Sequence, residues 1–91
     1  MSKIDIRRKH GKSLKAAKAA VDKTAAAIGR KFGIHSEWDG DTLNFHRTGG
    51  SGQIHVTKTE VRVTAELGFF MSALKPMIET EIEQQLDENF G

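Results

Sequence analysis

Residues 12–27, KSLKAAKAAVDKTAAA, decide how the whole chain is interpreted, because lysine spaced through alanine suits two different structures. The segment could be a disordered basic arm that grips DNA, or the surface helix of a compact domain. The apolar residues at 14, 17, 21, 25, 28 and 32 fall within one narrow arc of a helix. Ser13 is a suitable N-cap and Gly33 a suitable left-handed C-cap. We therefore predict a packed amphipathic helix with a basic outer face.

The segments on either side of this helix predict β-structure. Residues 3–9, KIDIRRK, alternate between polar and apolar and indicate a half-buried strand. In residues 34–47, a turn at Asp39-Gly40 would pair Ser36 with Leu43 and keep the apolar residues on one face. Residues 48–52, TGGSG, are too rich in glycine for a strand and predict a flexible loop. A second hairpin is expected around Lys58-Thr59.

A second amphipathic helix is expected over residues 72–89, because apolar residues recur at every fourth position from Phe70 to Leu86. Pro76 fits the first turn of such a helix, and the acidic residues between 79 and 88 form its exposed surface. The 91 residues then make one α+β domain, residues 1–91, in the order β-α-β-β-β-β-α. An antiparallel sheet, a four-strand meander plus the N-terminal strand, carries both helices on one face. The position of the first strand is left open.

Charge is divided unevenly along the chain. The first 35 residues hold ten basic and two acidic residues, a net charge of +8, and the rest hold four basic and ten acidic residues, a net charge of −6. Such asymmetry indicates an anionic partner for the first part, or complementarity between the two parts within or between subunits. Non-specific nucleic acid is one candidate partner, and no base-reading motif is present. The candidate anion-binding residues are Arg7, Lys9, Lys12, Lys15, Lys23 and Arg30.

Several classes of function are disfavoured by what the sequence lacks. There is no cysteine, hence no disulfide, thiolate metal site or thiol nucleophile. No apolar run is long enough to span a membrane, and the N-terminus has no signal-peptide core, so we expect a cytoplasmic protein. No serine or threonine has a matched histidine and acid, and no pair of carboxylates is expected in a pocket. We predict neither enzymatic activity nor a cofactor.

The uncovered sheet face is a further candidate surface, for a partner or for a second copy of the chain. The predicted register places His46 opposite His55, with His35 on the diagonal, close enough for a shared metal. Polar sheet faces commonly carry histidine, however, and no HxH or HExxH motif accompanies these three, so we predict no metal site. The candidate residues on this face are His35, Glu37, His46, His55 and Arg62.

Four stretches resemble one family of bacterial proteins, the polyhydroxyalkanoic acid system proteins. They are IDIRRKHGKSLKAAKAAVD (4–22), FGIHSEWDGDTLNFHR (32–47), QIHVT (53–57) and VRVTAELGFFMSALKPMIETEI (61–82), nearly the whole chain. The family is associated with genes for making and using polyhydroxyalkanoate storage polyester, some of whose products coat the granules. The resemblance implies a non-enzymatic accessory role, with the granule or a granule-associated protein as partner. It supplies no catalytic residues.

We hypothesise that apolar residues near the start of the second helix touch the polyester. An amphipathic helix can lie on an apolar interface, and phenylalanine and methionine suit an irregular one. The alternative is that the same residues belong to the core. A nucleic-acid-binding module and a small module that holds an apolar ligand between sheet and helices remain alternatives for the function. The candidate contact residues are Phe69, Phe70, Met71, Leu74 and Met77.

Overall fold

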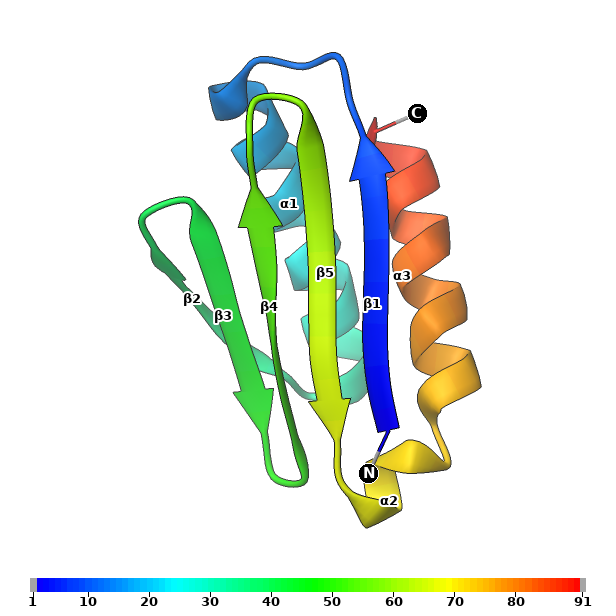
Figure 1. The fold of residues 1–91 in the computed structure, drawn as a ribbon. Helices are drawn as coiled ribbons and strands as arrows, with labels where there is room; N and C mark the ends of the chain where they lie inside the picture. Colours follow the sequence, from blue (N-terminus) through cyan, green and yellow to red (C-terminus); the bar gives the residue numbers. More distant parts are fainter. Residues whose placement is uncertain (1, 91) are drawn as a thin grey trace.

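A computed structural model of the protein describes residues 2–90, which form a five-stranded antiparallel sheet with the order β1-β5-β4-β3-β2 (Figure 1). The strands are β1 (Ser2–Lys9), β2 (His35–Asp39), β3 (Thr42–Arg47), β4 (Gly50–Val56) and β5 (Glu60–Leu67). The helices are α1 (Leu14–Phe32), α2 (Phe69–Ser72) and α3 (Lys75–Phe90). The predicted α+β class is confirmed, and β1 takes the edge position beside β5 that the sequence left open.

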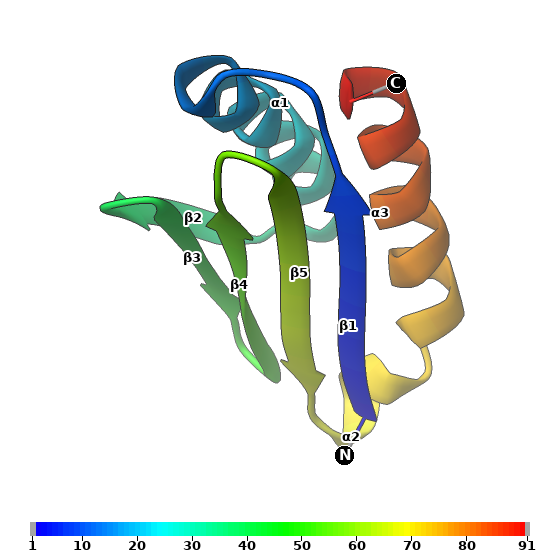
Figure 2. The same cartoon turned by 45° about the horizontal axis from the view of Figure 1, so that its top comes forward.

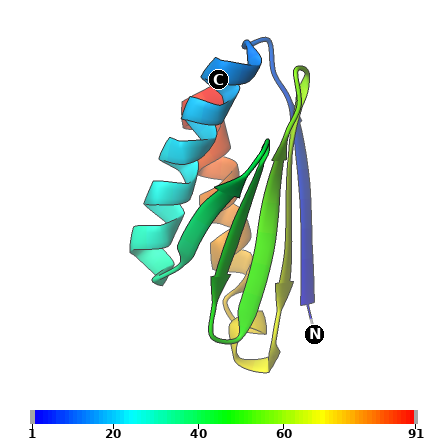
Figure 3. The ribbon, with the colours of Figure 1, turned by 90° about the vertical axis from the view of Figure 1, so that its left-hand side faces the viewer.

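The two long helices pack side by side on one face of the sheet, as Figures 2 and 3 show. The core between the layers is apolar: Ile4, Leu43 and Val63 from the strands meet Val21 and Leu86 from the helices, all at most 2% exposed. No element of residues 2–90 covers the other face of the sheet (Figure 3). The sheet therefore has one apolar face in the core and one polar face in solvent, as its alternating sequence predicts.

Both ends of α1 follow the local signals of the sequence. The Ser13 hydroxyl accepts a hydrogen bond from the Ala16 amide at 3.2 Å, which caps the N-terminus. Gly33 adopts a left-handed conformation with φ of 67°, and the Ile34 amide donates to the Gly29 carbonyl at 3.0 Å. This bond closes a Schellman motif. The predicted helix and both of its caps are confirmed.

The β4–β5 and β2–β3 hairpins differ in how well their register was predicted. Val56 lies opposite Val61, so the hairpin around Lys58-Thr59 is confirmed. In the β2–β3 hairpin, Leu43 lies opposite Trp38 instead of Ser36, so the predicted register is wrong by two residues. The turn is formed by residues 40 and 41, and only the glycine has positive φ, at 64°. A shift of two preserves which side chains share a face, so the predicted apolar face survives the error.

The glycine-rich segment 48–52 is not a flexible loop, so that prediction is wrong. Residues 48 and 49 form the turn, and β4 already begins at Gly50. A Cβ atom on Gly52 would lie 2.5 Å from the Thr64 carbonyl oxygen and 2.6 Å from the Phe45 ring. The glycine thus permits a close approach of β5 and of an aromatic side chain within the sheet, which is a known reason for glycine inside a strand.

The second helix, predicted over residues 72–89, begins at Lys75 instead of Ser72, and a separate short helix, α2, precedes it. A continuous helix would set the ring of Pro76 against the Ser72 carbonyl and would lose the hydrogen bond to that carbonyl, because proline has no amide hydrogen. The chain turns instead at residues 73 and 74, and Pro76 becomes the second residue of α3. Ile82 and Leu86 stay in the buried stripe, whereas Phe70 is rotated out of it.

Candidate functional site

Two neighbouring phenylalanines on α2 are almost fully exposed. The exposed fractions of Phe69 and Phe70 are 87% and 86%, and their rings meet edge to face with centroids 5.5 Å apart. Met77, on the first turn of α3, is 56% exposed. Helix α2 lies at one end of the molecule, where β5 ends and β1 begins (Figures 1 and 2). We call Phe69 and Phe70 the phenylalanine pair.

The backbone beneath the phenylalanine pair is anchored on both sides. The Gly68 amide donates to the Gly49 carbonyl at 2.7 Å, and a Cβ on Gly68 would come within 2.9 Å of that oxygen. The Ser72 hydroxyl donates to the Gly68 carbonyl at 2.9 Å. Met71, only 5% exposed, points into the core and fixes the rotation of α2. With Met71 inside, the two preceding residues of this short helix face solvent.

The five predicted contact residues therefore divide into two groups. Met71 is buried and Leu74 is half-buried against the core, so these two residues are structural. Phe69, Phe70 and Met77 are free at the surface. A large apolar side chain gains about 1.5–3 kcal/mol when it is fully buried. Covering both rings of the phenylalanine pair would thus favour a complex by about 3–6 kcal/mol, before the losses of association.

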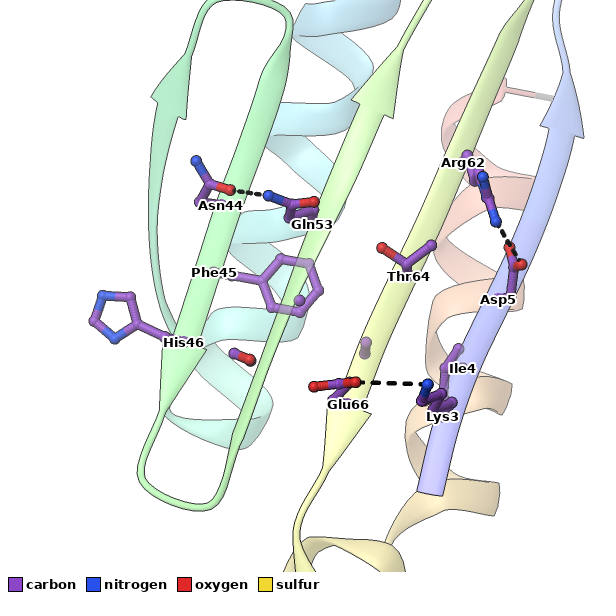
Figure 4. A pocket seen from close by; sticks show the side chains of 13 residues that line it. Lys3, Ile4, Asp5, Asn44, Phe45, His46, Gln53, Arg62, Thr64 and Glu66 are labelled. Carbon is purple, nitrogen blue, oxygen red and sulfur yellow. Dashed lines mark hydrogen bonds and ion pairs between the residues drawn. The ribbon is translucent and has the colours of Figure 1, made fainter. Parts of the chain in front are cut away.

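The open sheet face carries a trough of about 580 Å³ between β3–β4 and β5–β1 (Figure 4). Its charged side chains engage one another. Arg62 donates to both carboxylate oxygens of Asp5, at 3.0 and 2.8 Å, and Lys3 lies 3.7 Å from Glu66. The hydrogen bond from Arg62 lowers the pKa of the Asp5 carboxyl and raises the pKa of Arg62 itself. Most of the side chains that line this trough are polar, although Ile4, Phe45 and Ala65 also contribute, and its charged groups form ion pairs within the chain.

The three histidines of the open face do not meet at one point. His35 lies directly opposite His46, with ring centroids 6.3 Å apart, whereas His55 lies opposite Thr42 and shares a 3.0 Å hydrogen bond with its hydroxyl. The predicted pairing of His46 with His55 is wrong because the β3–β4 turn has two residues. Among residues 2–90 no three metal-ligating side chains converge. Glu37, opposite Asn44, is exposed on the same face.

The six predicted anion-binding residues lie on two sides of the molecule. Arg7, on the open sheet face, is 3.9 Å from Glu60, and Lys9 follows on the same side of β1. Arg8, between them, faces α3 and binds Glu83 and Asp87. The other four predicted residues lie on or just before α1, on its exposed side, so β1 and α1 do not form one continuous stripe. They are Lys12, Lys15, Lys23 and Arg30.

The charge asymmetry is partly neutralised within the fold. Each of the seven ion pairs described in residues 2–90 joins the first 35 residues to the remainder. Glu81 illustrates this, since it is 9% exposed and lies 3.4 Å from Lys31 instead of on the acidic exterior that the sequence predicted. Part of the positive charge of the first 35 residues is therefore neutralised by acidic residues of the remainder, as one of the two interpretations of the asymmetry predicted.

A cluster around Trp38 was not predicted from the sequence. The indole donates to the Asp22 carboxylate at 2.6 Å, and the Lys18 ammonium lies 4.8 Å from the ring centroid. The same ammonium binds the Gly40 carbonyl at 2.9 Å and Asp41 at 3.3 Å. The cluster ties α1 to the β2–β3 turn. The spacing of Lys18 and Asp22, four residues apart, shows in the sequence that both side chains lie on the same side of α1. That both of them contact Trp38 depends on the tertiary fold.

The interior offers little room for an apolar ligand. The hollow between the sheet and the helices, lined by Phe45, Ile54, Met71 and Ile78 among others, has a volume of about 30 Å³. A cavity needs about 10–15 Å³ of such space for one water molecule, so this hollow has room for about two. A fatty acyl chain would have to separate the layers, so the structure does not favour the ligand-binding alternative.

Residues 4–90 match the family model described as "Putative polyhydroxyalkanoic acid system protein". The chain belongs to this family, as the resemblance of its sequence indicated. No curated protein matches the chain. Across the described residues, none of the helices is long and apolar enough to cross a membrane.

Proposed function

We propose that the protein is a non-enzymatic accessory protein of the polyhydroxyalkanoate system that docks on the storage granule through the phenylalanine pair. The main support is the exposure of Phe69 and Phe70, at 87% and 86%, on an anchored helix. Removing apolar side-chain surface from water is favourable in free energy. The alkyl and ester groups of a polyester can contact the two rings in place of water. On this proposal the protein acts in the cytoplasm, at the granule.

The position of α2 suits contact with a broad surface. Figures 1 and 3 show α2 at an extremity of the molecule, beyond the start of β4 and the end of β5. A projecting element can reach a flat or irregular surface without any rearrangement of the sheet. Exposed apolar side chains that are held by a fixed backbone also lose little entropy on binding. These features support docking of the intact fold.

The non-enzymatic part of the proposal is supported by the open sheet face. In the trough, Asp5 and Glu66 are each bound to a cation of the same chain. Acid–base catalysis requires a group that is free to exchange a proton with a substrate. These carboxylates are instead engaged in ion pairs and are at least half exposed, which favours a structural role.

Co-sedimentation with protein-free polyhydroxyalkanoate particles, at low and high salt, tests the proposal. We expect the wild type to sediment at both salt concentrations, because apolar contact resists screening. The variant Phe69→Ser/Phe70→Ser should stay in the supernatant. A control variant, Lys15→Gln/Lys23→Gln/Arg30→Gln, should sediment as the wild type does.

Two results would contradict the proposal. Binding that disappears at high salt would assign the contact to charged residues instead of the phenylalanine pair. Absence of binding at either salt would exclude direct contact with the polyester. In that case granules isolated with their protein coat would show whether a granule-associated protein is the partner.

A further inference from the structure

We infer that the outer face of α1 is a second binding surface, which docks on the phosphate backbone of duplex DNA without reading its sequence. This inference goes beyond the proposed function and does not depend on the phenylalanine pair. The face, here called the α1 cation row, is formed by four exposed side chains. They are Lys12, Lys15, Lys23 and Arg30.

The members of the α1 cation row have no acidic partner among the described residues, and Asp22, the one acid of α1, accepts a hydrogen bond from Trp38. Neighbouring cations of α1 are engaged: Lys18 is bound to Asp41, and Lys31 to Glu81. Within residues 2–90, none of the four members of the row forms an ion pair. The internal pairing thus leaves three positive charges on the outer side of α1 and a fourth, Lys12, just before the helix; in the same part of the chain, Lys9 on β1 is unpaired as well.

The geometry of the row suits an extended polyanion. Lys15, Lys23 and Arg30 are separated by eight and seven residues, which corresponds to about 12 and 10.5 Å along the helix axis. At 100° per residue they point within about 80° of one another. The exposed residues Ala19 and Ala26 lie between them and let a partner approach closely. The row therefore presents cations along a single line of more than 20 Å.

The α1 helix is already fixed in the fold, so binding requires little further loss of conformational entropy. It is capped at both ends, and its Val21 side is fully buried in the core. The bond from Trp38 to Asp22 fastens its outer edge to β2. Cations on a preorganised helix lose less entropy on association than cations on a disordered arm do.

The chemistry of the face favours duplex DNA over other polyanions. An interfacial helix needs a free apolar side, and the apolar side of α1, for example Ile28 at 7% exposure, is already in the core. Single strands are bound by stacking on aromatic rings, and the α1 cation row contains none. A duplex carries about one charge per 1.7 Å of its axis, twice the density of a single strand.

The same face predicts binding without sequence preference. Bases are read by side chains that enter a groove, and the exposed surface of α1 offers alanine and long cations, which suit phosphates. On the adjacent helix, Glu79 and Glu88 have no ion pair among the described residues. Their charge repels phosphate on that side. On β2, Glu37 and Asp39 are likewise exposed and have no ion pair among residues 2–90, so we expect the duplex to approach the outer side of α1, between these two acidic flanks.

Fluorescence anisotropy with a labelled 20-base-pair duplex, between 50 and 200 mM salt, tests the inference. Four phosphate contacts predict a slope of about −3.6 for the logarithm of the binding constant against the logarithm of salt concentration. The variant Lys15→Gln/Lys23→Gln/Arg30→Gln should retain a slope of only about −0.9. A variant with the same loss of charge, Lys9→Gln/Lys58→Gln/Lys75→Gln, should bind as the wild type does.

The outcomes separate this inference from the proposed function. Equal affinity for two unrelated duplex sequences supports it, as does unchanged DNA binding by Phe69→Ser/Phe70→Ser. It is overturned if the wild type does not bind at 50 mM salt, or if the control variant loses as much affinity as the α1 variant. Stronger binding to single-stranded DNA, to RNA, or to vesicles of phosphatidylcholine and phosphatidylglycerol would overturn the choice of duplex DNA.

Discussion

Helix α1 and the segment from Gly68 to Phe90 differ in how completely their apolar side chains are buried. Along α1 every residue of the apolar stripe is buried or half-buried, from Leu14 to Phe32. In the second segment Ile78, Ile82 and Leu86 of α3 are buried, but the phenylalanine pair is exposed to solvent. The difference follows from continuity of the backbone. A stripe of side chains lies on one face only while the helix continues, and the turn before Pro76 breaks this helix.

The two regions also depend on different kinds of contact. The ends of α1 are specified by its own neighbours, Ser13 and Gly33. The conformation of α2 is specified by distant parts of the chain, since its Gly68 is bound to Gly49 in the β3–β4 turn. Local signals thus define the helix that carries charge, whereas tertiary packing defines the element that exposes apolar rings.

The largest expected effect on stability comes from Leu86, which belongs with Phe70 to the apolar pattern that recurs at every fourth residue. Leu86→Ala should lower the free energy of unfolding by about 2–5 kcal/mol, because Leu86 is fully buried. Phe70→Ala should change it by less than about 0.5 kcal/mol, because the ring has no core to leave. Urea unfolding followed by Trp38 fluorescence measures both. A Phe70→Ala loss as large as that of Leu86→Ala would place Phe70 in the core.

The next effect concerns the glycines of β4, near α2. Gly52→Ala should destabilise the fold by about 1–3 kcal/mol, because its Cβ would meet the Thr64 carbonyl at 2.5 Å and the Phe45 ring at 2.6 Å. Gly50→Ala is the matched control, since its nearest neighbour would be 3.4 Å away. We expect the control to be neutral or slightly stabilising. Thermal unfolding distinguishes the two, and equal melting temperatures would contradict the close approach.

A smaller effect tests the C-terminal cap of α1. Gly33→Ala should cost about 1 kcal/mol, because alanine is strained at the positive φ of 67°. Gly11→Ala, at a position without positive φ and with nothing within 4 Å of the added Cβ, should change stability by less than about 0.5 kcal/mol. Chemical unfolding of both variants provides the measurement. If Gly33→Ala were harmless, α1 would not be ended by its own cap.

The smallest effect concerns the ion pair of Asp5 and Arg62, which lies outside both regions. The pKa of Asp5 is lowered in the folded state, so its contribution to stability is present above its unfolded value of 3.8 and is lost as pH falls through the folded pKa. The melting temperature of the wild type should therefore fall more steeply below pH 3.8 than that of Asp5→Asn. Parallel curves would show that this exposed pair contributes nothing.

Most of the fold could be predicted because it follows local rules. Alternation, helical spacing and the caps at Ser13 and Gly33 suffice for the element order and for α1. The register of two hairpins was missed because the position and the length of a turn depend on which glycine takes positive φ, and composition alone does not decide that. Gly52 was assigned to a loop because its role in the strand cannot be inferred from its neighbours in sequence. The lack of a side chain at this position matters only in the folded sheet, where β5 and the Phe45 ring come close to it.

The candidate site was predictable only in part. The sequence singled out Phe69 and Phe70, but it could not separate them from Met71, because exposure depends on the rotation of α2. For the basic residues, alternation along β1 predicts that Arg7 and Arg8 face opposite sides. Where α3 packs, and hence which cations it neutralises, depends on the tertiary arrangement.

The central claim, that the α2 end and not α1 meets the granule, can be tested by a polarity-sensitive dye. The chain has no cysteine, so a single cysteine can be introduced at the exposed position 73 beside α2, or at the exposed position 26 on α1. Each labelled protein is mixed with bare polyester particles at high salt. We predict a blue shift of emission for Ala73→Cys and none for Ala26→Cys. A shift at position 26 alone, or at neither position, would contradict the account.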